Sequence, residues 1–90
     1  MIYEYEGEPL KRMLLGMDYE KPLRLFEVVA LSKKSVQRTR MIIFEQLRMR
    51  KRALIRVEMQ GKYKVYKLTL LGVQHKTLLQ IEGNENGSST

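Results

Sequence analysis

The hydrophobic pattern of this 90-residue chain changes its period twice, and this change limits the fold more than any other feature. Apolar side chains recur at helical spacing up to about residue 51, alternate with polar ones over residues 55–68, and return to helical spacing over residues 70–81. Helices and strands repeat their buried faces with periods of about 3.6 and 2 residues, so one kind of element cannot satisfy both patterns. The sequence therefore predicts an α+β domain with three helices, a two-stranded β-hairpin and a C-terminal helix, in that order.

Proline positions and apolar spacing predict the first two helices. An acidic residue and Pro9 favour a helix start, and apolar residues then recur at i, i+3, i+4 and i+7 over residues 10–17. A second helix of about nine residues is expected after Pro22, along the apolar run that begins at Leu23. Residues 31–35 are rich in Ser and Lys and predict a tight turn, in which either serine can cap the next helix.

A third helix is predicted from Val36 to about residue 51. Its expected core stripe consists of Val36, Ile43 and Leu47, with Phe44 at the edge. Ile42 and Met49 form a second, narrower apolar seam on roughly the opposite side. That seam is either core beneath the first helix or a contact with a second protomer.

Strict alternation from Ile55 onward predicts the hairpin, with its turn at residues 60–62. Thr69 can cap a last helix that carries apolar residues as far as Ile81. The remaining residues are polar and small, with nothing to bury. We therefore expect one domain over residues 1–82 and a flexible polar tail over residues 83–90.

The positive charge of the chain is concentrated in one segment. The whole chain has 17 Lys and Arg against 10 Asp and Glu, a net charge of +7. Residues 33–56 hold nine of these cations and only one carboxylate, a net charge of +8. Clustering of this kind favours an acidic partner, with nucleic acid as the main candidate and an ordinary solvated helix face as the alternative.

Several classes of protein are disfavoured by what the sequence lacks. It has no cysteine and only one histidine, His75, so we expect no disulfide, no zinc and no other metal site. No nucleophile–base set, paired carboxylates or phosphate loop is present, so we expect neither an enzyme nor a cofactor. No apolar run approaches a membrane span, and the first residues are unlike a signal peptide, which predicts a cytoplasmic, nucleoid-associated protein.

Two stretches resemble the winged helix-turn-helix family of DNA-binding regulators. Residues 31–39, LSKKSVQRT, are similar to its turn and recognition-helix start. Leu54-Ile55, Gly61 and the run from Tyr66 to Gly72, YKLTLLG, are similar to its wing. The resemblance covers about residues 9–82 and implies the fold that the periodicity predicts.

Two features depart from the usual pattern of that family. Arg40 occupies a position, one turn after Val36, that the family fills with an apolar residue. The separation of Val36 from Leu54 is 18 residues, which is long for the family. Either the third helix is extended, or the linker that follows it bulges.

The resemblance implies a role for each candidate DNA-binding residue. Residues 35–51 form the recognition helix in the major groove, and residues 60–64 form a wing on the backbone or minor groove. Side chains at the turn hold a phosphate, those early in the helix contact bases, and later cations line the phosphate track. The candidates are, for the turn, Lys33, Lys34 and Ser35; for bases, Gln37 and Met41; for a guanine or a phosphate, Arg38; for phosphates, Arg48, Arg50, Lys51, Arg52 and Arg56; and for the wing, Lys62, Tyr63 and Lys64.

These residues predict a sequence-specific, double-stranded DNA-binding transcriptional regulator. Short operators usually need two half-sites, so a homodimer is expected, through the last helix, the first helix or the Ile42/Met49 seam. One alternative is a DNA-architectural or plasmid-partition protein with the same fold. Another is a winged-helix module that binds protein or RNA.

Overall fold

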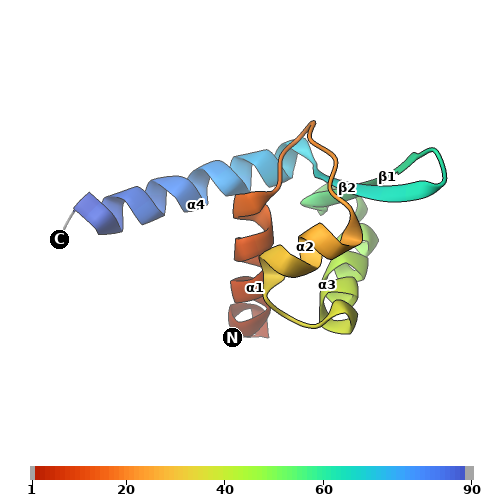
Figure 1. Ribbon diagram of the computed structural model, residues 1–90. Helices are drawn as coiled ribbons and strands as arrows, with labels where there is room; N and C mark the ends of the chain where they lie inside the picture. The colour runs from red at the N-terminus through yellow and green to blue at the C-terminus, as the bar shows by residue number, and fades with distance from the viewer. Residues whose placement is uncertain (1, 89–90) are drawn as a thin grey trace.

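The computed structural model describes the backbone of residues 2–88 and the side chains of residues 7–82. The first three helices pack together, and the hairpin and the C-terminal helix extend from them in opposite directions (Figure 1). This is the predicted α+β architecture, a winged helix-turn-helix domain with a closing helix. Its elements are α1 (Ile2–Gly16), α2 (Leu25–Ser32), α3 (Val36–Arg48), the 3₁₀ helix η1 (Arg50–Arg52), β1 (Ile55–Gln60), β2 (Tyr63–Leu68) and α4 (Leu70–Ser88).

The hydrophobic core lies where α1 meets the other helices and the base of the hairpin. Helix α1 packs against α2, α3 and α4, so the N-terminal helix contacts every other α-helix in the described part of the chain. The apolar spacing of residues 10–17, which predicted an amphipathic helix, therefore marks the central helix of the domain. The most deeply buried apolar side chains of the core are Met13, Met17, Val28, Ile55 and Leu68.

Two helix starts differ from the predicted ones. Helix α1 begins at Ile2, so Pro9 lies inside it, where its fully buried ring contributes packing that offsets the lost backbone donor. The apolar run predicts Leu23 within the second helix, but Leu23 forms a bridge to the hairpin instead. Its backbone exchanges two hydrogen bonds with Tyr66, at N···O distances of 3.1 and 2.8 Å. These bonds satisfy the edge of β2, which explains why α2 starts only at Leu25.

The buried face of α3 is not the predicted stripe. Val36 is 50% exposed, Phe44 is 62% exposed and Leu47 is 36% exposed. At about 100° per residue, the buried face is rotated by roughly 70° from that stripe. Apolar spacing could not reveal this face because half of its members are polar. The buried residues of α3 are Thr39, Ile42, Ile43 and Gln46.

This rotation accounts for two features that were ambiguous in the sequence. Arg40 is exposed to solvent, so its charge does not face the core, and Val36 is not the buried valine of the family pattern. Ile42 is core, whereas Met49 is 45% exposed at the end of α3. The Ile42/Met49 seam is therefore core at one position only.

A bulged linker, and not a longer helix, separates α3 from the hairpin. Helix α3 ends at Arg48, and η1 follows after Met49. Arg50 adopts a left-handed backbone conformation with φ of 54°, which turns the chain. The buried Gln46 side chain accepts a hydrogen bond from the Leu54 backbone N–H at 2.8 Å and fixes the end of the linker.

The hairpin has the predicted strands and turn. Strand β1 pairs antiparallel with β2, from Ile55 opposite Leu68 to Gln60 opposite Tyr63. Gly61 is the first residue of the two-residue turn and has a φ of +65°, a conformation that favours glycine. The register places Val57 and Lys64 toward α3 and Arg56 and Lys67 on the opposite face.

Thr69 caps α4, as predicted, and its Oγ1 accepts a hydrogen bond from the Gly72 N–H at 3.0 Å. Gly72 is required because a Cβ there would overlap the Leu54 carbonyl oxygen. The helix then continues to Ser88, six residues past the predicted domain end at residue 82. Residues 83–88 are therefore helical where a flexible tail was predicted, since a formed helix extends by local hydrogen bonds without apolar periodicity. Residues 89 and 90 lie outside the described part of the chain.

Candidate nucleic-acid interface

A buried polar network sets the turn between α2 and α3. Ser32 and Thr39 are fully buried, and their hydroxyl oxygens lie 2.7 Å apart. Ser32 Oγ also accepts from the Lys34 N–H at 3.1 Å, and the Ser32 carbonyl accepts from Arg12 at 2.7 Å. Because these groups are satisfied only in one arrangement, the network fixes how α3 leaves α2.

The turn presents its cations at the N-terminus of α3. Lys33 ends α2 in a left-handed conformation with φ of 59°, and both Lys33 and Lys34 are exposed. Ser35 is the N-cap, as predicted, and its Oγ accepts from the Arg38 N–H at 3.1 Å. An anion at this point would meet two ammonium groups and the positive end of the helix dipole.

The exposed face of α3 combines polar and apolar side chains. Gln37 and Arg48 share its centre with Met41 and Phe44, which are 54% and 62% exposed. Arg38 lies apart from Gln37, half-buried on the flank that faces α1, where it lines a shallow depression with Leu10. Met41 lines this depression as well as the surface around Gln37, so it lies between Arg38 and Gln37, and the structure does not place those two side chains in one pocket.

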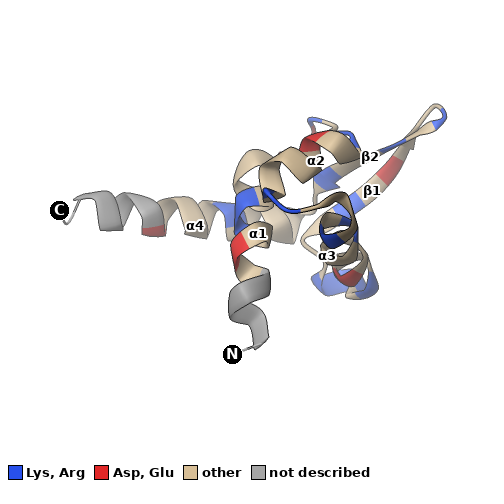
Figure 2. Ribbon diagram, turned by 60° about the horizontal axis from the view of Figure 1, so that its bottom comes forward, with Lys and Arg blue, Asp and Glu red and all other residues tan. Residues whose placement is uncertain are grey.

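The other predicted cations occupy different settings. Arg48 forms an exposed ion pair with Glu45 at 3.5 Å. The three residues of η1, Arg50 to Arg52, are all exposed. Figure 2 shows basic residues on the turn before α3, along α3 and at the hairpin tip.

The tip of the hairpin carries Lys62, Tyr63 and Lys64, all exposed. The guanidinium carbon of Arg24 lies 3.8 Å from the centre of the Tyr63 ring, a cation–π contact. Arg24 thus adds a cation beside the wing that sequence reasoning missed. No local signal could have revealed it, because the contact joins residues 39 positions apart.

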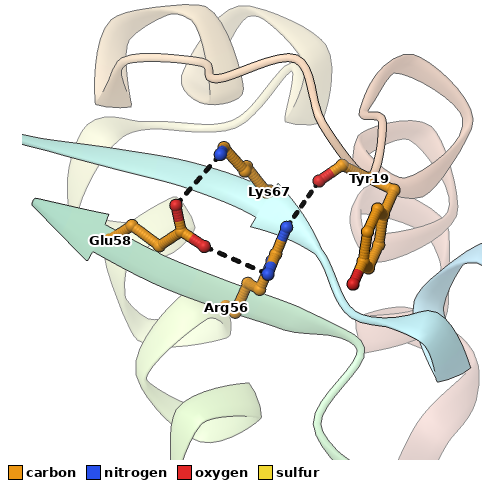
Figure 3. Close-up of polar contacts among 4 residues, drawn as sticks. All are labelled: Tyr19, Arg56, Glu58 and Lys67. Atoms are coloured by element: carbon orange, nitrogen blue, oxygen red, sulfur yellow. Dashed lines mark hydrogen bonds and ion pairs between the residues drawn. The ribbon is translucent and has the colours of Figure 1, made fainter. Parts of the chain in front are cut away.

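Arg56 is not on the predicted phosphate track. It donates to the Tyr19 carbonyl at 2.7 Å, pairs with Glu58 at 3.0 Å and stacks on the Tyr19 ring at 4.4 Å (Figure 3). Alternation along β1 turns this side chain toward the loop between α1 and α2, where a backbone carbonyl needs a donor. Arg56 therefore joins the hairpin to that loop and is a structural residue.

Glu58 lies between two cations on the same face of the hairpin. Lys67 Nζ donates to Glu58 Oε1 at 2.9 Å, and Arg56 pairs with the other carboxylate oxygen (Figure 3). The hydrogen bond from Lys67 holds the pKa of Glu58 below its usual value, and the charges of Arg56 and Lys67 act in the same direction. This carboxylate is therefore part of the hairpin's internal pairing.

A groove of about 480 Å³ separates α3 from the hairpin. Its walls are mostly apolar, and Arg40 and Lys64 are its two charged residues. The full lining consists of Gln37, Arg40, Met41, Ile43, Phe44, Leu47, Val57, Lys64 and Tyr66. We refer to it as the α3–hairpin groove.

A second groove, of about 440 Å³, lies between α1 and α4, and we refer to it as the α1–α4 groove. Its apolar residues include Leu78 and Ile81, which are 59% and 47% exposed. One cation, Lys11, and one carboxylate, Glu82, also line it. The side chain of Lys76 fixes α4 to the end of α1, donating to the Met17 carbonyl at 2.7 Å.

The described residues include no helix long and apolar enough to cross a membrane. Among the same residues, no group of three or more His, Asp or Glu side chains could hold a metal ion. His75 lies exposed on α4, where its Nδ1 is 3.3 Å from the Leu71 carbonyl oxygen.

Comparison with known proteins yields one structural likeness. No protein-family model matches the chain, and no curated protein matches it in sequence. Human N-acetylserotonin methyltransferase, in its crystal structure with SAM, is similar to 78% of this chain with a TM-score of 0.50 and 22% sequence identity. The similar region is only 23% of that methyltransferase chain. At this identity the likeness is one of fold alone.

Proposed function

We propose that this protein is a sequence-specific double-stranded DNA-binding transcriptional regulator that places α3 in the major groove. The observation that carries the proposal is where the +8 segment lies in the fold. Apart from Arg56, its cations lie on the turn before α3, on α3 itself and on η1, and Lys62 and Lys64 add to them from the wing. A helix-turn-helix presents these same elements to DNA.

The exposed face of α3 suggests a division of roles. Gln37 occupies the centre of that face near the N-terminus, where its amide can pair with an adenine and Met41 can contact a thymine methyl. Arg38 points along the flank toward α1, so we assign it to a phosphate. Lys33 and Lys34 hold a second phosphate at the N-terminus of α3, and the wing cations hold the next stretch of backbone.

The protein acts as a homodimer in this proposal, and the α1–α4 groove supports that arrangement. The side chains of Leu78 and Ile81 are apolar and exposed, and the groove beside them also has mostly apolar walls. A two-fold pairing lets each protomer insert these side chains into the groove of its partner. The groove carries one charge of each sign, on Lys11 and Glu82, so pairing there adds no local repulsion between two chains of +7.

Selection of bound duplexes from a random pool tests this function. A regulator enriches a defined sequence, and two half-sites in inverted repeat indicate the dimer. Binding of the enriched duplex should weaken steeply with salt, since each neutralised phosphate releases counterions. No enrichment over random duplex, or a salt slope near zero, would contradict the proposal.

The exposed Phe44 and Met41 favour a protein-interaction module as the second candidate, because DNA backbone offers no partner to an exposed phenyl ring. Competition separates the two candidates. If structured RNA or an acidic protein displaces the selected duplex at equal charge concentration, the regulator function is wrong.

A further inference from the structure

We propose that the α3–hairpin groove binds a small organic anion with an apolar body. This site goes beyond DNA binding, and its occupancy can be measured on the free protein. Its volume of about 480 Å³ is within the range of small-molecule sites in proteins, roughly 300–1,000 Å³.

The walls of the groove select the apolar body. Phe44 and Leu47 of α3 face Val57 of β1 across the groove, and Tyr66 adds a second ring. The Phe44 ring is 62% exposed and Met41, beside it, is 54% exposed, so these side chains lack full packing partners within the chain. A flat apolar molecule between helix and hairpin would remove these surfaces from water.

The charges of the groove select the anionic group. Arg40 and Lys64 are exposed and contribute the only charges among the nine lining residues, which include no carboxylate. Neighbouring positions explain why neither cation has an acidic partner among the described residues. Arg40 has Val36 and Phe44 one turn away on α3, and Lys64 lies opposite Met59 across the hairpin.

The two sets of groups define one ligand class. A carboxylate held by Arg40 and Lys64 would leave an attached ring or chain against Phe44 and Leu47, and Gln37 can donate a further hydrogen bond. An aromatic carboxylate is the simplest member of this class. An uncharged apolar molecule would make no ion pair with either cation. A small anion such as acetate would leave the apolar walls of the groove exposed to water.

Occupancy of the groove would also affect the proposed DNA face. Gln37, Met41 and Lys64 belong both to the groove and to the surface that we assign to DNA. Bound ligand and bound duplex would therefore exclude each other, which makes the anion an inducer of release. This consequence rests on the proposed function, whereas the binding site itself does not.

The test is titration of the ¹⁵N-labelled protein with naphthalene-2-carboxylate, followed by amide chemical shifts. Shifts should concentrate on residues 37–47, 57 and 64–66. The matched neutral probe, naphthalene-2-carboxamide, should bind about tenfold more weakly, since a charge-assisted hydrogen bond is lost. Acetate should produce no saturable shift.

Variants locate the two halves of the site. Arg40→Gln should weaken the carboxylate about tenfold and leave the carboxamide unchanged. Arg52→Gln removes a matched exposed arginine outside the groove and should change neither affinity. Phe44→Ala should weaken both probes, and the far amide shifts of α1 and α4 report that the fold is retained.

Three results would overturn the site: equal affinity for the two probes, shifts confined to the α1–α4 groove, or no saturation at millimolar concentration. A final arm adds the selected duplex. If the carboxylate binds as described but no duplex binds, the ligand site in the groove is supported and the proposed DNA-binding function is wrong. If duplex binds and the carboxylate does not displace it, the inducer role is wrong.

Discussion

The two grooves of this domain have similar volumes and apolar walls, yet their charges differ. The α3–hairpin groove carries two cations and no carboxylate, whereas the α1–α4 groove carries one charge of each sign. Apolar area alone would assign both grooves the same role. Charge distinguishes them, because a cationic surface adds local repulsion toward a second copy of a +7 chain and a balanced surface does not.

The largest expected effect comes from breaking the α1–α4 groove. Leu78→Glu with Ile81→Glu should convert the dimer to a monomer, since four added carboxylates per dimer would be buried in a groove whose single cation, Lys11, is already offset by Glu82. Loss of the second half-site should then weaken binding to a two-half-site duplex by about a hundredfold or more. Sedimentation and duplex titration measure the two effects.

The control for this double variant is Leu70→Glu. Leu70 is 67% exposed on the same helix and does not line the groove. The Leu70→Glu variant should remain dimeric, and its affinity for DNA should be unchanged. Dimer retention by the double variant would rule out the α1–α4 groove as the interface.

The next effect concerns base contact at the edge of the α3–hairpin groove. Gln37→Ala should cost about 1–3 kcal/mol on the selected duplex and leave random duplex nearly unchanged, because a bidentate adenine contact is lost. Competition between the two duplexes measures this difference. Equal losses on both would mean that Gln37 does not contact a base.

A smaller effect is expected at the wing side of the same groove. Lys64→Ala should weaken selected and random duplex by the same factor and reduce the slope of log affinity against log salt by about one, as one phosphate contact is lost. Lys21→Ala removes an exposed cation that belongs to neither groove nor the proposed DNA interface, and it should leave the slope unchanged. An unaltered slope for Lys64→Ala would exclude the wing from the DNA interface.

The smallest expected effect is on the stability of the protein, and it comes from the face of the hairpin opposite the α3–hairpin groove. The hydrogen bond from Lys67 lowers the pKa of Glu58, so the folded state favours the charged carboxylate more than the unfolded state does. This stabilisation is present above the unfolded pKa and is lost as the pH falls through the lower folded pKa. Glu58→Gln should therefore lower the free energy of unfolding at neutral pH and flatten its decline as the pH falls below the ordinary pKa of a Glu side chain.

Urea unfolding of wild type and variant across this pH range measures the difference. Lys67→Met should produce the same flattening, because it removes the main cause of the lowered pKa. If both variants retain the wild-type pH dependence, the ion pair of the hairpin does not contribute.

Much of the fold was predictable from local patterns. Period two from Ile55, the left-handed glycine at Gly61 and the capping residues Ser35 and Thr69 are all encoded within a few positions, and the structure contains the predicted hairpin and caps. The rotation of α3 was not predictable in this way. Its buried face includes polar side chains whose partners, such as the Leu54 N–H for Gln46, come from other elements.

The candidate site was predictable in part for the same reason. Lys33, Lys34 and the wing residues lie exposed near the ends of elements, where their position follows from the local turn. Arg38 and Arg56 have the same charge as those lysines, yet one lies on a flank and the other pairs internally. Charge type in the sequence did not distinguish exposed cations from those with structural partners.

The sequence by itself determined the order of helices and strands and the concentration of charge around α3, because periodicity, turn residues and net charge are local or additive properties. Only the tertiary structure decided which face of α3 is buried, that Arg56 contacts Tyr19 in the loop between α1 and α2, and that Arg24 reaches Tyr63. It also decided the two grooves, since each lies between separate elements whose relative placement depends on the core. Such features depend on which polar groups can find partners across the core, and a one-dimensional pattern does not contain that information.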